Sequence, residues 1–514
     1  MAQRRVAVIG AGLGGLAAAL DLASQGHAVT VLERAATPGG KMREVEAAGR
    51  RIDSGPTVFT MRWVLEALFA DAGLSLDDHL TTTKLSVLAR HAWGEGPTLD
   101  LFADRGASAD AIGAFAGPAE AQGYRDFIAR AGAIYRTLEG SFMTAERPNP
   151  ISLAWRVGLR GLPGLARVSP FATLWGELAK HFRDPRLRQL FGRYATYCGA
   201  SPFSAPATLM LIAHVEQEGV WAVEGGMHRV AQAMAAAATR HGATFRYGAE
   251  VTAILSERGR ASGVRLADGE VIGADAVIAN ADHAALRTGL FGADAAAATR
   301  GKAPPRSLSA VTWSLSARAS GFPLIRHTVF FSDDYEAEFD QIVRQRRLPD
   351  TPTAYVCAQD RGDPGDPAPD GPERIFCLVN APADGDSRPP SPTEISRCAE
   401  TTFAQLSRAG LSLSPEATVA TTPEGFEALF PATGGALYGR ALHGWAASFQ
   451  RPGARTRLPG LFTAGGSVHP GPGVPMATLS GRLAARAAAA WLAQGSVSIR
   501  GFSPAAISGG TSTA

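Results

Sequence analysis

The feature that most constrains the fold is a glycine pattern directly after the first apolar run of the chain. Residues 6–9 (VAVI) form this short β-branched run, and an alanine-rich stretch typical of a helix follows the glycines. Gly10 permits a tight turn, Gly12 lets a pyrophosphate approach the backbone, and Gly15 lets the helix pack closely on the strand. The order G-x-G-x-x-G at this place predicts the first unit of a Rossmann-like dinucleotide-binding fold.

A second predicted strand, residues 28–32, ends at Glu33. An acid about 20 residues after the first glycine can accept hydrogen bonds from a ribose diol. A further glycine turn, Gly39 and Gly40, precedes Lys41 and leads to the segment IDSGP at residues 52–56. Periodicity and spacing support a dinucleotide, but they do not decide between NAD and FAD.

The N-terminus has an alternative interpretation, because Arg4 and Arg5 before an apolar run imitate a secretory or twin-arginine signal. The glycine spacing, the lack of an A-x-A cleavage site and the acidic Asp21 favour the structural interpretation. No apolar run approaches the roughly 20 residues of a membrane-spanning helix. If the protein meets a membrane, we expect it to lie on the surface.

Charge and cysteine content narrow the choice of partners. The net charge is only +3, from 50 basic and 47 acidic residues, so nucleic acid is not expected as a partner. The four cysteines are widely spaced, without a C-x-x-C pair or a grouping with histidine. They are typical of core thiols in a reducing compartment, and no metal site is predicted.

The middle of the chain, from about residue 82 to 215, has a pattern that predicts helices. Between residues 151 and 193, eight basic residues accompany two acids and many large apolar side chains. Such a surface suits an interfacial helix on anionic lipid, but a solvated helix face that covers a core is the alternative. The basic residues are Arg156, Arg160, Arg167, Lys180, Arg183, Arg186, Arg188 and Arg193.

The pattern after this region returns to that of a nucleotide fold. A helix is expected at His228–Arg240, followed by strands at residues 243–247, 250–256, 262–266 and 275–279. From about residue 300 to 440, apolar strands alternate with loops rich in proline and aspartate. We expect these strands to form a mixed sheet that makes one wall of a substrate cavity.

A second glycine-rich segment lies close to the C-terminus. Residues 461–485, LFTAGGSVHPGPGVPMATLSGRLAA, begin as a strand, pass through glycines and prolines, and restart as a helix. A turn of this kind aims backbone N–H groups at one point. It predicts a binding place for a negatively charged or carbonyl-rich ligand.

Three separated blocks resemble the FAD-dependent amine oxidase and carotenoid desaturase superfamily. They are the acid and glycine turn from Glu33 to Lys41, the segment GVWAVEGGM at residues 219–227, and GGSVHPGPGVP at residues 465–475. Family members usually carry arginine at the place of Lys41. The resemblance implies FAD, bound by Gly10, Gly12, Gly14, Gly15, Glu33, Arg34, Gly39, Gly40, Lys41, Gly55, Pro56, Val251, Gly465, Gly466, Ser467, Gly473, Val474 and Met476.

The resemblance also implies an α/β fold in two discontinuous parts. One is a Rossmann-like FAD-binding domain of the flavin amine oxidase and phytoene desaturase type. The other is an α+β substrate domain with a helical, membrane-facing region. The expected FAD-binding parts are residues 1–81, 220–295 and 438–495, the substrate-binding parts are residues 82–219 and 296–437, and residues 496–514 are expected to be a flexible tail.

Within the superfamily, residues 193–221 (RYATYCGASPFSAPATLMLIAHVEQEGVW) resemble the hydroxycarotenoid desaturases of purple phototrophic bacteria. This implies desaturation at C3–C4 of an acyclic, hydroxylated C40 carotenoid such as 1-hydroxyneurosporene, on the route to spheroidene- or spirilloxanthin-type pigments. It also implies a peripheral place on the cytoplasmic side of the inner photosynthetic membrane. The electron acceptor stays open between oxygen, a quinone and another carrier.

Other functions are weighed against this one. A phytoene desaturase would have a different sequence in residues 193–221. A flavin amine oxidase would generally have G-E-x-T in place of GGSVHP, and a carotenoid isomerase is a further alternative. An escort-type flavoprotein shares the nucleotide fold, but the intact C-terminal block argues against it.

Three polar residues are candidates for chemistry or substrate recognition. His469 could accept a proton or orient the flavin, or it could brace the Gly/Pro turn. His214 and Glu216 could recognise a tertiary hydroxyl of the substrate, or they could cap a helix or lie at the surface. We find no Ser-His-Asp, Cys-His or metal constellation in the sequence.

Overall fold

A computed structural model of the chain describes residues 3–146, 172–299, 301–444 and 446–499. Its N-terminal strand β1 is the centre of a five-stranded sheet with the order β19-β13-β1-β2-β9, in which all strands are parallel. Strands of such a sheet are buried on both faces, which explains the unbroken apolar run at residues 6–9. The bounds are β1 Arg5–Ile9, β2 Ala28–Glu33, β9 Thr244–Tyr247, β13 Ala276–Ala279 and β19 Leu461–Thr463.

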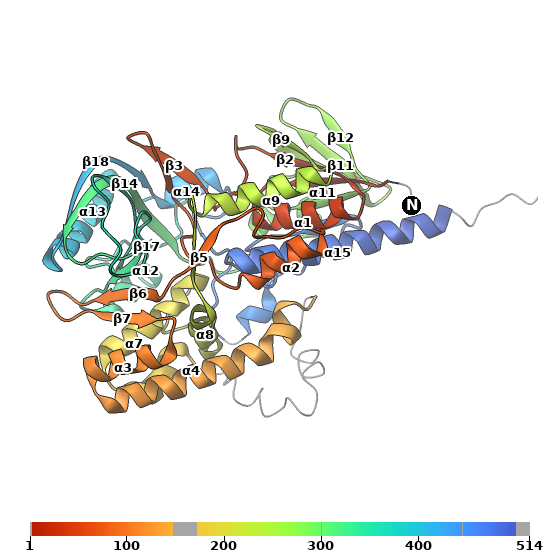
Figure 1. The fold of residues 1–514 in the computed structure, drawn as a ribbon. Coiled ribbons are helices and arrows are strands. Elements are labelled where there is room, and N and C mark those ends of the chain that lie inside the picture. Colours follow the sequence, from red (N-terminus) through yellow and green to blue (C-terminus); the bar gives the residue numbers. More distant parts are fainter. Residues whose placement is uncertain (1–2, 147–171, 300, 445, 500–514) are drawn as a thin grey trace, which may run out of the picture.

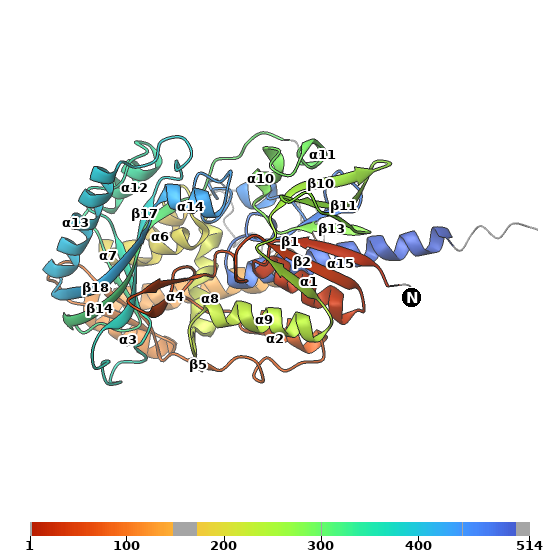
Figure 2. The ribbon, with the colours of Figure 1, turned by 90° about the horizontal axis from the view of Figure 1, so that it is seen from above.

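Helices and a small sheet cover the two faces of this parallel sheet (Figure 2). On one face α1 (Leu13–Ser24) lies between α9 (His228–Arg240) and α15 (Val474–Ile499), and its alanines are fully buried. On the other face lies the antiparallel sheet of β10 (Val251–Glu257), β11 (Arg260–Leu266) and β12 (Val271–Gly273). The predicted helix His228–Arg240 and the six predicted strands around it and at the N-terminus are confirmed.

A seven-stranded sheet forms the second half of the molecule, at the left of Figure 1. Its order is β18-β14-β17-β16-β15-β6-β7, and only the β15–β6 pair is parallel. The predicted mixed sheet between residues 300 and 440 is therefore confirmed. The strand bounds are β6 Val87–Ala92, β7 Leu99–Phe102, β14 Ser309–Gly321, β15 His327–Phe330, β16 Ala354–Ala358, β17 Glu373–Ala381 and β18 Leu411–Thr421. The helices beside it are α12 Tyr335–Val343, α13 Pro392–Arg408 and α14 Pro423–Leu429.

The prediction of helices from about residue 82 is wrong for its first twenty residues. This stretch forms β5 (Thr82–Lys84), β6 and β7. Strand β6 pairs with β15, more than 200 residues away, so a local pattern could not reveal its place. Helices follow from residue 105: α3 Arg105–Ala116, α4 Pro118–Leu138, η1 Glu139–Met143, α6 Leu174–His181, α7 Pro185–Gly192, η2 Arg193–Cys198, η3 Ala207–Met210 and α8 Leu211–Glu218.

The basic segment between residues 151 and 193 is only partly described, and Arg156, Arg160 and Arg167 lie outside the described residues. In the described part, Lys180 pairs with Glu177, and Arg186 pairs with Asp184. The apolar residues Leu174, Leu178 and Phe182 are fully buried. These contacts favour the interpretation of a helix face that covers a core for residues 172–193.

Asp53 joins the two halves of the molecule. Its carboxylate accepts hydrogen bonds from the backbone N–H groups of Met227 and His228, at 2.6 and 3.0 Å, where α9 begins. Its own backbone N–H and C=O bond the side chain of Gln359 from the second half. Strands β3 (Glu44–Ala47) and β4 (Arg50–Asp53) pack on the second sheet, whereas α2 (Trp63–Asp71) packs on α1 and α15. Strand β8 (Trp221–Val223) pairs with β5.

Candidate active site

The first glycine turn makes a tight cradle at the end of β1. A Cβ atom at Gly15 would lie 2.1 Å from the carbonyl oxygen of Gly10. A Cβ atom at Gly12 would lie 2.8 Å from Asn280 Nδ2, and Gly10 itself has φ +89°, which favours glycine. The close strand–helix packing that the sequence predicts at Gly15 is therefore present.

The second glycine turn packs directly on the first. The N–H of Gly39 donates to the carbonyl of Ala11 at 2.8 Å, and a Cβ atom at Gly40 would lie 3.2 Å from Gly12 Cα. Glu33 is 8% exposed, and its carboxylate accepts backbone N–H groups of Ala11 and Ala35 at 2.7 and 2.8 Å. Each carboxylate oxygen keeps a lone pair for a further donor, as a ribose diol requires.

Two predicted cationic contacts have other partners in the structure. Arg34 is exposed, and its guanidinium donates to the carbonyls of Ala428 and Leu429 at the end of α14. Lys41 Nζ donates to the carbonyl of Leu437 at 2.7 Å, and burial lowers the pKa of this amine. Both side chains therefore hold the chain of residues 428–437 against the nucleotide fold. Val251 is buried in β10, two residues after a backbone bond to Glu33.

The C-terminal glycine turn packs against the N-terminal cradle, so that segments from both ends of the chain form one site. A Cβ atom at Gly14 would lie 2.8 Å from the backbone nitrogen of Gly465. Gly466 accepts a hydrogen bond from Arg451 through its carbonyl, and Ser467 Oγ accepts the backbone N–H of His283. The turn then leads into α15, whose first residue is Val474.

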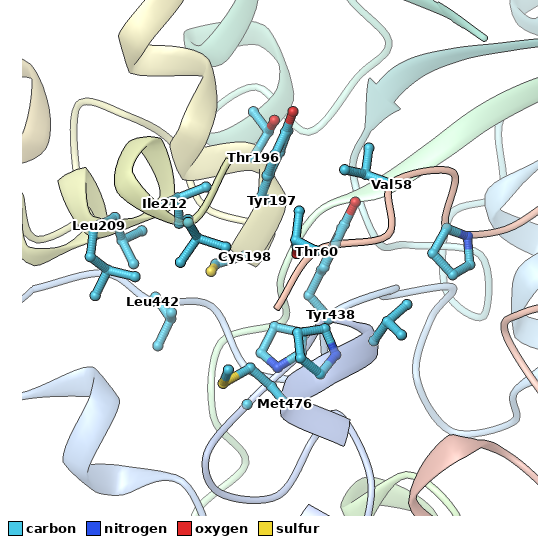
Figure 3. A pocket seen from close by; sticks show the side chains of 18 of the residues that line it. Val58, Thr60, Thr196, Tyr197, Cys198, Leu209, Ile212, Tyr438, Leu442 and Met476 are labelled. Carbon is cyan, nitrogen blue, oxygen red and sulfur yellow. The ribbon is translucent and has the colours of Figure 1, made fainter. Parts of the chain in front are cut away.

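A mostly apolar cavity of about 540 Å³ opens beside this turn (Figure 3). This volume lies within the usual range for ligand pockets, about 300–1,000 Å³. Residues of the seven-stranded sheet form one wall, as the sequence predicts, and residues from α4, η1, η3 and α8 form another. Of the predicted cofactor residues, the cavity is lined by Gly55, Pro56, Gly473, Val474 and Met476.

A polar cluster on the cavity wall, formed by Arg193, Tyr194, Tyr197 and Glu216, interrupts the apolar lining. Tyr194 and Tyr197 each donate to one carboxylate oxygen of Glu216, at 2.6 and 2.7 Å. Arg193 Nη2 donates to the Tyr197 hydroxyl at 2.9 Å. Burial lowers the pKa of Arg193, but Tyr197 and Glu216 oppose this and leave the pKa above its ordinary value. Burial also raises the pKa of both tyrosines, so they remain protonated donors.

The structure separates the two predicted substrate residues. Glu216 lines the cavity, but His214 does not, because the cavity face of α8 is made by Leu211, Ile212, Val215 and Glu216. The His214 ring is 5% exposed and lies against Tyr135, with Nε2 3.1 Å from Glu218. The structure thus places Glu216, but not His214, in the cavity lining, and a substrate role for either residue stays a prediction.

His469 is placed behind the turn instead of in the cavity lining. Its side chain is 3% exposed, and Nε2 lies 3.0 Å from the carbonyl oxygens of both Phe142 and Ala145. The ring also meets Phe142 edge to face. This arrangement favours the bracing interpretation, since Nε2 faces backbone acceptors of η1 and the following loop.

Sequence reasoning missed several residues that the fold brings to the site. Asn280 follows β13, and its side chain lies among Gly10, Gly12 and Gly14. Because ligands bind at the carboxyl ends of parallel strands, the residue after a predicted strand at 275–279 was a usable signal. Arg451 is 2% exposed and lines the cavity, and burial lowers its pKa to about 10. No local pattern marks Arg451.

The glycine turns fit a long dinucleotide. They leave no room for a Cβ atom at Gly14 or Gly15, Glu33 at the end of β2 keeps acceptor sites that suit a ribose diol, and the N-terminus of α15 meets the apolar cavity. A helix N-terminus favours negative charge on a bound group. A nucleotide fold with this cavity defines a flavoprotein oxidoreductase.

The chain belongs to the family of flavin containing amine oxidoreductases, which it matches over residues 13–489. It is similar to hydroxyneurosporene desaturase of Rubrivivax gelatinosus, with 56% identity over 99% of this chain and 97% of the relative. It is also 46% identical to hydroxyneurosporene desaturase of Cereibacter sphaeroides, over 95% of this chain and 98% of the relative. The prediction of an FAD-dependent oxidoreductase of this superfamily is confirmed.

A solved structure supports the fold. An oxidoreductase from Methanosarcina mazei superposes with a TM-score of 0.56 at 18% identity, covering 93% of this chain and 99% of that one. The predicted α/β fold class is thereby confirmed. Among the described residues, none of the helices has the length and apolar character needed to cross a bilayer.

Proposed function

We propose that the protein desaturates an acyclic, hydroxylated C40 carotenoid, with 1-hydroxyneurosporene as its model substrate, and introduces the C3–C4 double bond. The single observation that carries this proposal is the mostly apolar cavity of about 540 Å³ that is lined in part by the turn before α15. A polyene hydrocarbon needs a lining of this kind, and the names of the two relatives agree with it.

The reaction removes a hydride from one carbon and a proton from its neighbour, and a new carbon–carbon double bond takes their place. Bound FAD supplies the hydride acceptor. The cradle residues hold the dinucleotide, and the apolar walls, such as Phe376, Leu378 and Leu209, hold the polyene straight and exclude water. Because a polyene spreads positive charge, positioning contributes more than a strong base.

We propose that FAD and the carotenoid are bound by different segments of the chain, with the bounds predicted from the sequence. All five strands of the parallel sheet come from residues 1–81, 220–295 and 438–495, which would hold FAD. All seven strands of the second sheet come from residues 82–219 and 296–437, which would bind the carotenoid. The cavity lies where the two sets meet, since residues of both line it.

The test compares three carotenoids with the purified FAD-loaded protein under anaerobic conditions. 1-Hydroxyneurosporene should bleach the flavin and give a product whose absorption lies at longer wavelength, because the polyene gains a conjugated bond. Phytoene should give neither change, and neurosporene, which has a C1–C2 double bond in place of the hydroxylated, saturated end, should react more slowly. If phytoene alone reduces the flavin, the protein is a phytoene desaturase and the proposal is wrong.

We also propose that the protein works as a peripheral protein on the cytoplasmic side of the inner membrane. The substrate dissolves in lipid, and the stretch of residues 151–193 is basic and rich in large apolar side chains. Anionic lipid attracts such a stretch. The protein should sediment with anionic vesicles at low salt and less so at high salt. A protein that stays in the supernatant at low salt would end this proposal.

A further inference from the structure

The polar cluster on the cavity wall contains a buried cation with unused hydrogen-bond donors. Arg193 is 7% exposed, yet it lines the cavity. Within the described part of the chain, its guanidinium makes one hydrogen bond, to Tyr197, and no ion pair, and its Nε has no partner. A buried guanidinium with free N–H groups is costly unless an acceptor arrives from elsewhere.

The acceptor half of the cluster stands beside this cation. Glu216 is 6% exposed and lines the cavity, and each of its oxygens receives one tyrosine hydroxyl. A carboxylate has about four lone-pair sites, so room for one more donor remains. Tyr197 links the two charges, because it accepts from Arg193 and donates to Glu216. The wall thus offers a donor and an acceptor side by side.

The cluster shares its cavity with Gly55 and Pro56, two of the predicted FAD-binding residues. Tyr355 lines the same cavity as Tyr197, and its hydroxyl is 2.7 Å from that of Thr57. Thr57 directly follows Gly55 and Pro56, which line the same cavity. In Figure 3, Tyr197 lies across the cavity from Met476 at the start of α15. A group held by the cluster would therefore lie in the same cavity as the proposed reaction centre.

We propose that Arg193, Tyr197 and Glu216 form one site that binds the terminal hydroxyl group of the substrate. The hydroxyl oxygen accepts from the guanidinium of Arg193, and the hydroxyl proton is donated to Glu216. This inference rests on the proposed function. In a 1-hydroxylated chain the hydroxyl is only a few bonds from C3 and C4, so anchoring it fixes which bond faces the flavin. The cluster is a positioning and specificity site for a neutral alcohol end group.

The test measures kcat and KM for 1-hydroxyneurosporene and for neurosporene, its hydrocarbon counterpart. The variants are Arg193→Gln, Glu216→Gln and the double variant. Each single variant leaves one buried charge without its neighbour, whereas the double variant removes both charges. We expect kcat/KM for the hydroxylated substrate to fall about 10- to 100-fold, as for lost hydrogen bonds to charged groups. The value for neurosporene should hardly change, so the preference for the hydroxyl should disappear. FAD content confirms that each variant is folded.

Arg246→Gln and Glu270→Gln are the matched controls. They make the same changes at a partly exposed ion pair that does not line the cavity. Both variants should keep the preference of the wild type. Equal losses for both carotenoids in the variants of Arg193 and Glu216, or an unchanged preference, would overturn the inference. If the wild type does not convert the hydroxylated substrate at all, the proposed function itself is wrong. This outcome differs from a failure of the hydroxyl site alone, in which the wild type is active but the variants keep its preference.

Discussion

At the residue scale, Gly14 is the position where the two ends of the chain meet. An added Cβ atom would lie 2.8 Å from the backbone nitrogen of Gly465 and 2.6 Å from Asn280 Oδ1. The backbone of Gly465 cannot move as a flexible side chain can, so the cradle and the C-terminal turn would have to separate. A glycine here is therefore a requirement of tertiary packing as well as of the local turn.

We expect Gly14→Ala to lose most of its bound FAD and about 1–3 kcal/mol of stability, the usual cost of overpacking. The ratio of flavin to protein absorbance after purification measures the first effect, and thermal unfolding measures the second. Gly301→Ala is the matched control, because a Cβ atom there meets nothing within 4 Å. A Gly14→Ala protein with full flavin content would contradict the described packing.

His469 gives a second prediction at this scale. Replacing it with alanine removes a donor from the backbone carbonyls of Phe142 and Ala145, which should cost about 1–3 kcal/mol. The rate of anaerobic flavin reduction by substrate should be unchanged, because the ring braces the turn behind the cavity. A large fall in that rate, with normal FAD content, would restore His469 as a catalytic residue.

At the scale of single elements, α12 carries a buried acid that ties three segments together. The Glu338 carboxylate accepts the hydroxyls of Ser332 and Thr353 at 2.8 and 2.7 Å, and the backbone N–H of Thr353 at 3.1 Å. Burial raises the pKa of Glu338 to about 7, despite these hydrogen bonds. The native state thus holds a proton that the unfolded chain releases near its ordinary pKa of 4.5.

The raised native pKa of Glu338 makes the stability of the protein depend on pH. A raised native pKa means that the contribution of Glu338 to stability is full below pH 4.5 and falls as the pH rises towards 7. The loss amounts to about 3 kcal/mol over that window, at about 1.4 kcal/mol for each pKa unit. Thermal midpoints of the wild type and of Glu338→Gln, measured from pH 4.5 to 8, should therefore diverge with rising pH in favour of the variant. If the two curves of thermal midpoint against pH stay parallel, Glu338 is not the origin of the pH dependence.

At the scale of the whole molecule, the last long helix closes the nucleotide fold. Arg482 on α15 pairs with Asp21 on α1 at 3.2 Å and also with Asp71 on α2. Burial raises the pKa of Asp21 to about 6, although Arg482 opposes the shift. Helix α15 also starts at the glycine turn that faces the cavity. FAD would therefore bridge segments from both ends of the chain.

We expect bound FAD to stabilise the entire protein. A ligand that binds only the native state adds about 2.7 kcal/mol at 100 times its Kd, and about 1.4 kcal/mol for each further tenfold. The thermal midpoint of the deflavinated protein should rise with FAD concentration in this way, but NAD should leave it unchanged. An equal rise with NAD would contradict the assignment of the glycine turns to FAD.

The local sequence was enough to predict the nucleotide fold and its glycine turns. These features follow from short local patterns, in which a strand, a turn and a helix are adjacent in the chain and only glycine fits. Gly10, Gly12, Gly15 and Glu33 could be placed in this way, and the resemblance of the turn at residues 465–475 completed the prediction.

The places of β6 and β7, and the choice of polar side chains that face the cavity, depend on tertiary packing. Arg193 counts as one of many surface cations in the sequence, but packing buries it beside Tyr197 and Glu216. His214, two residues before Glu216, turns away on the same helix. Burial and the identity of partners depend on segments far apart in the chain, so no local pattern contains them.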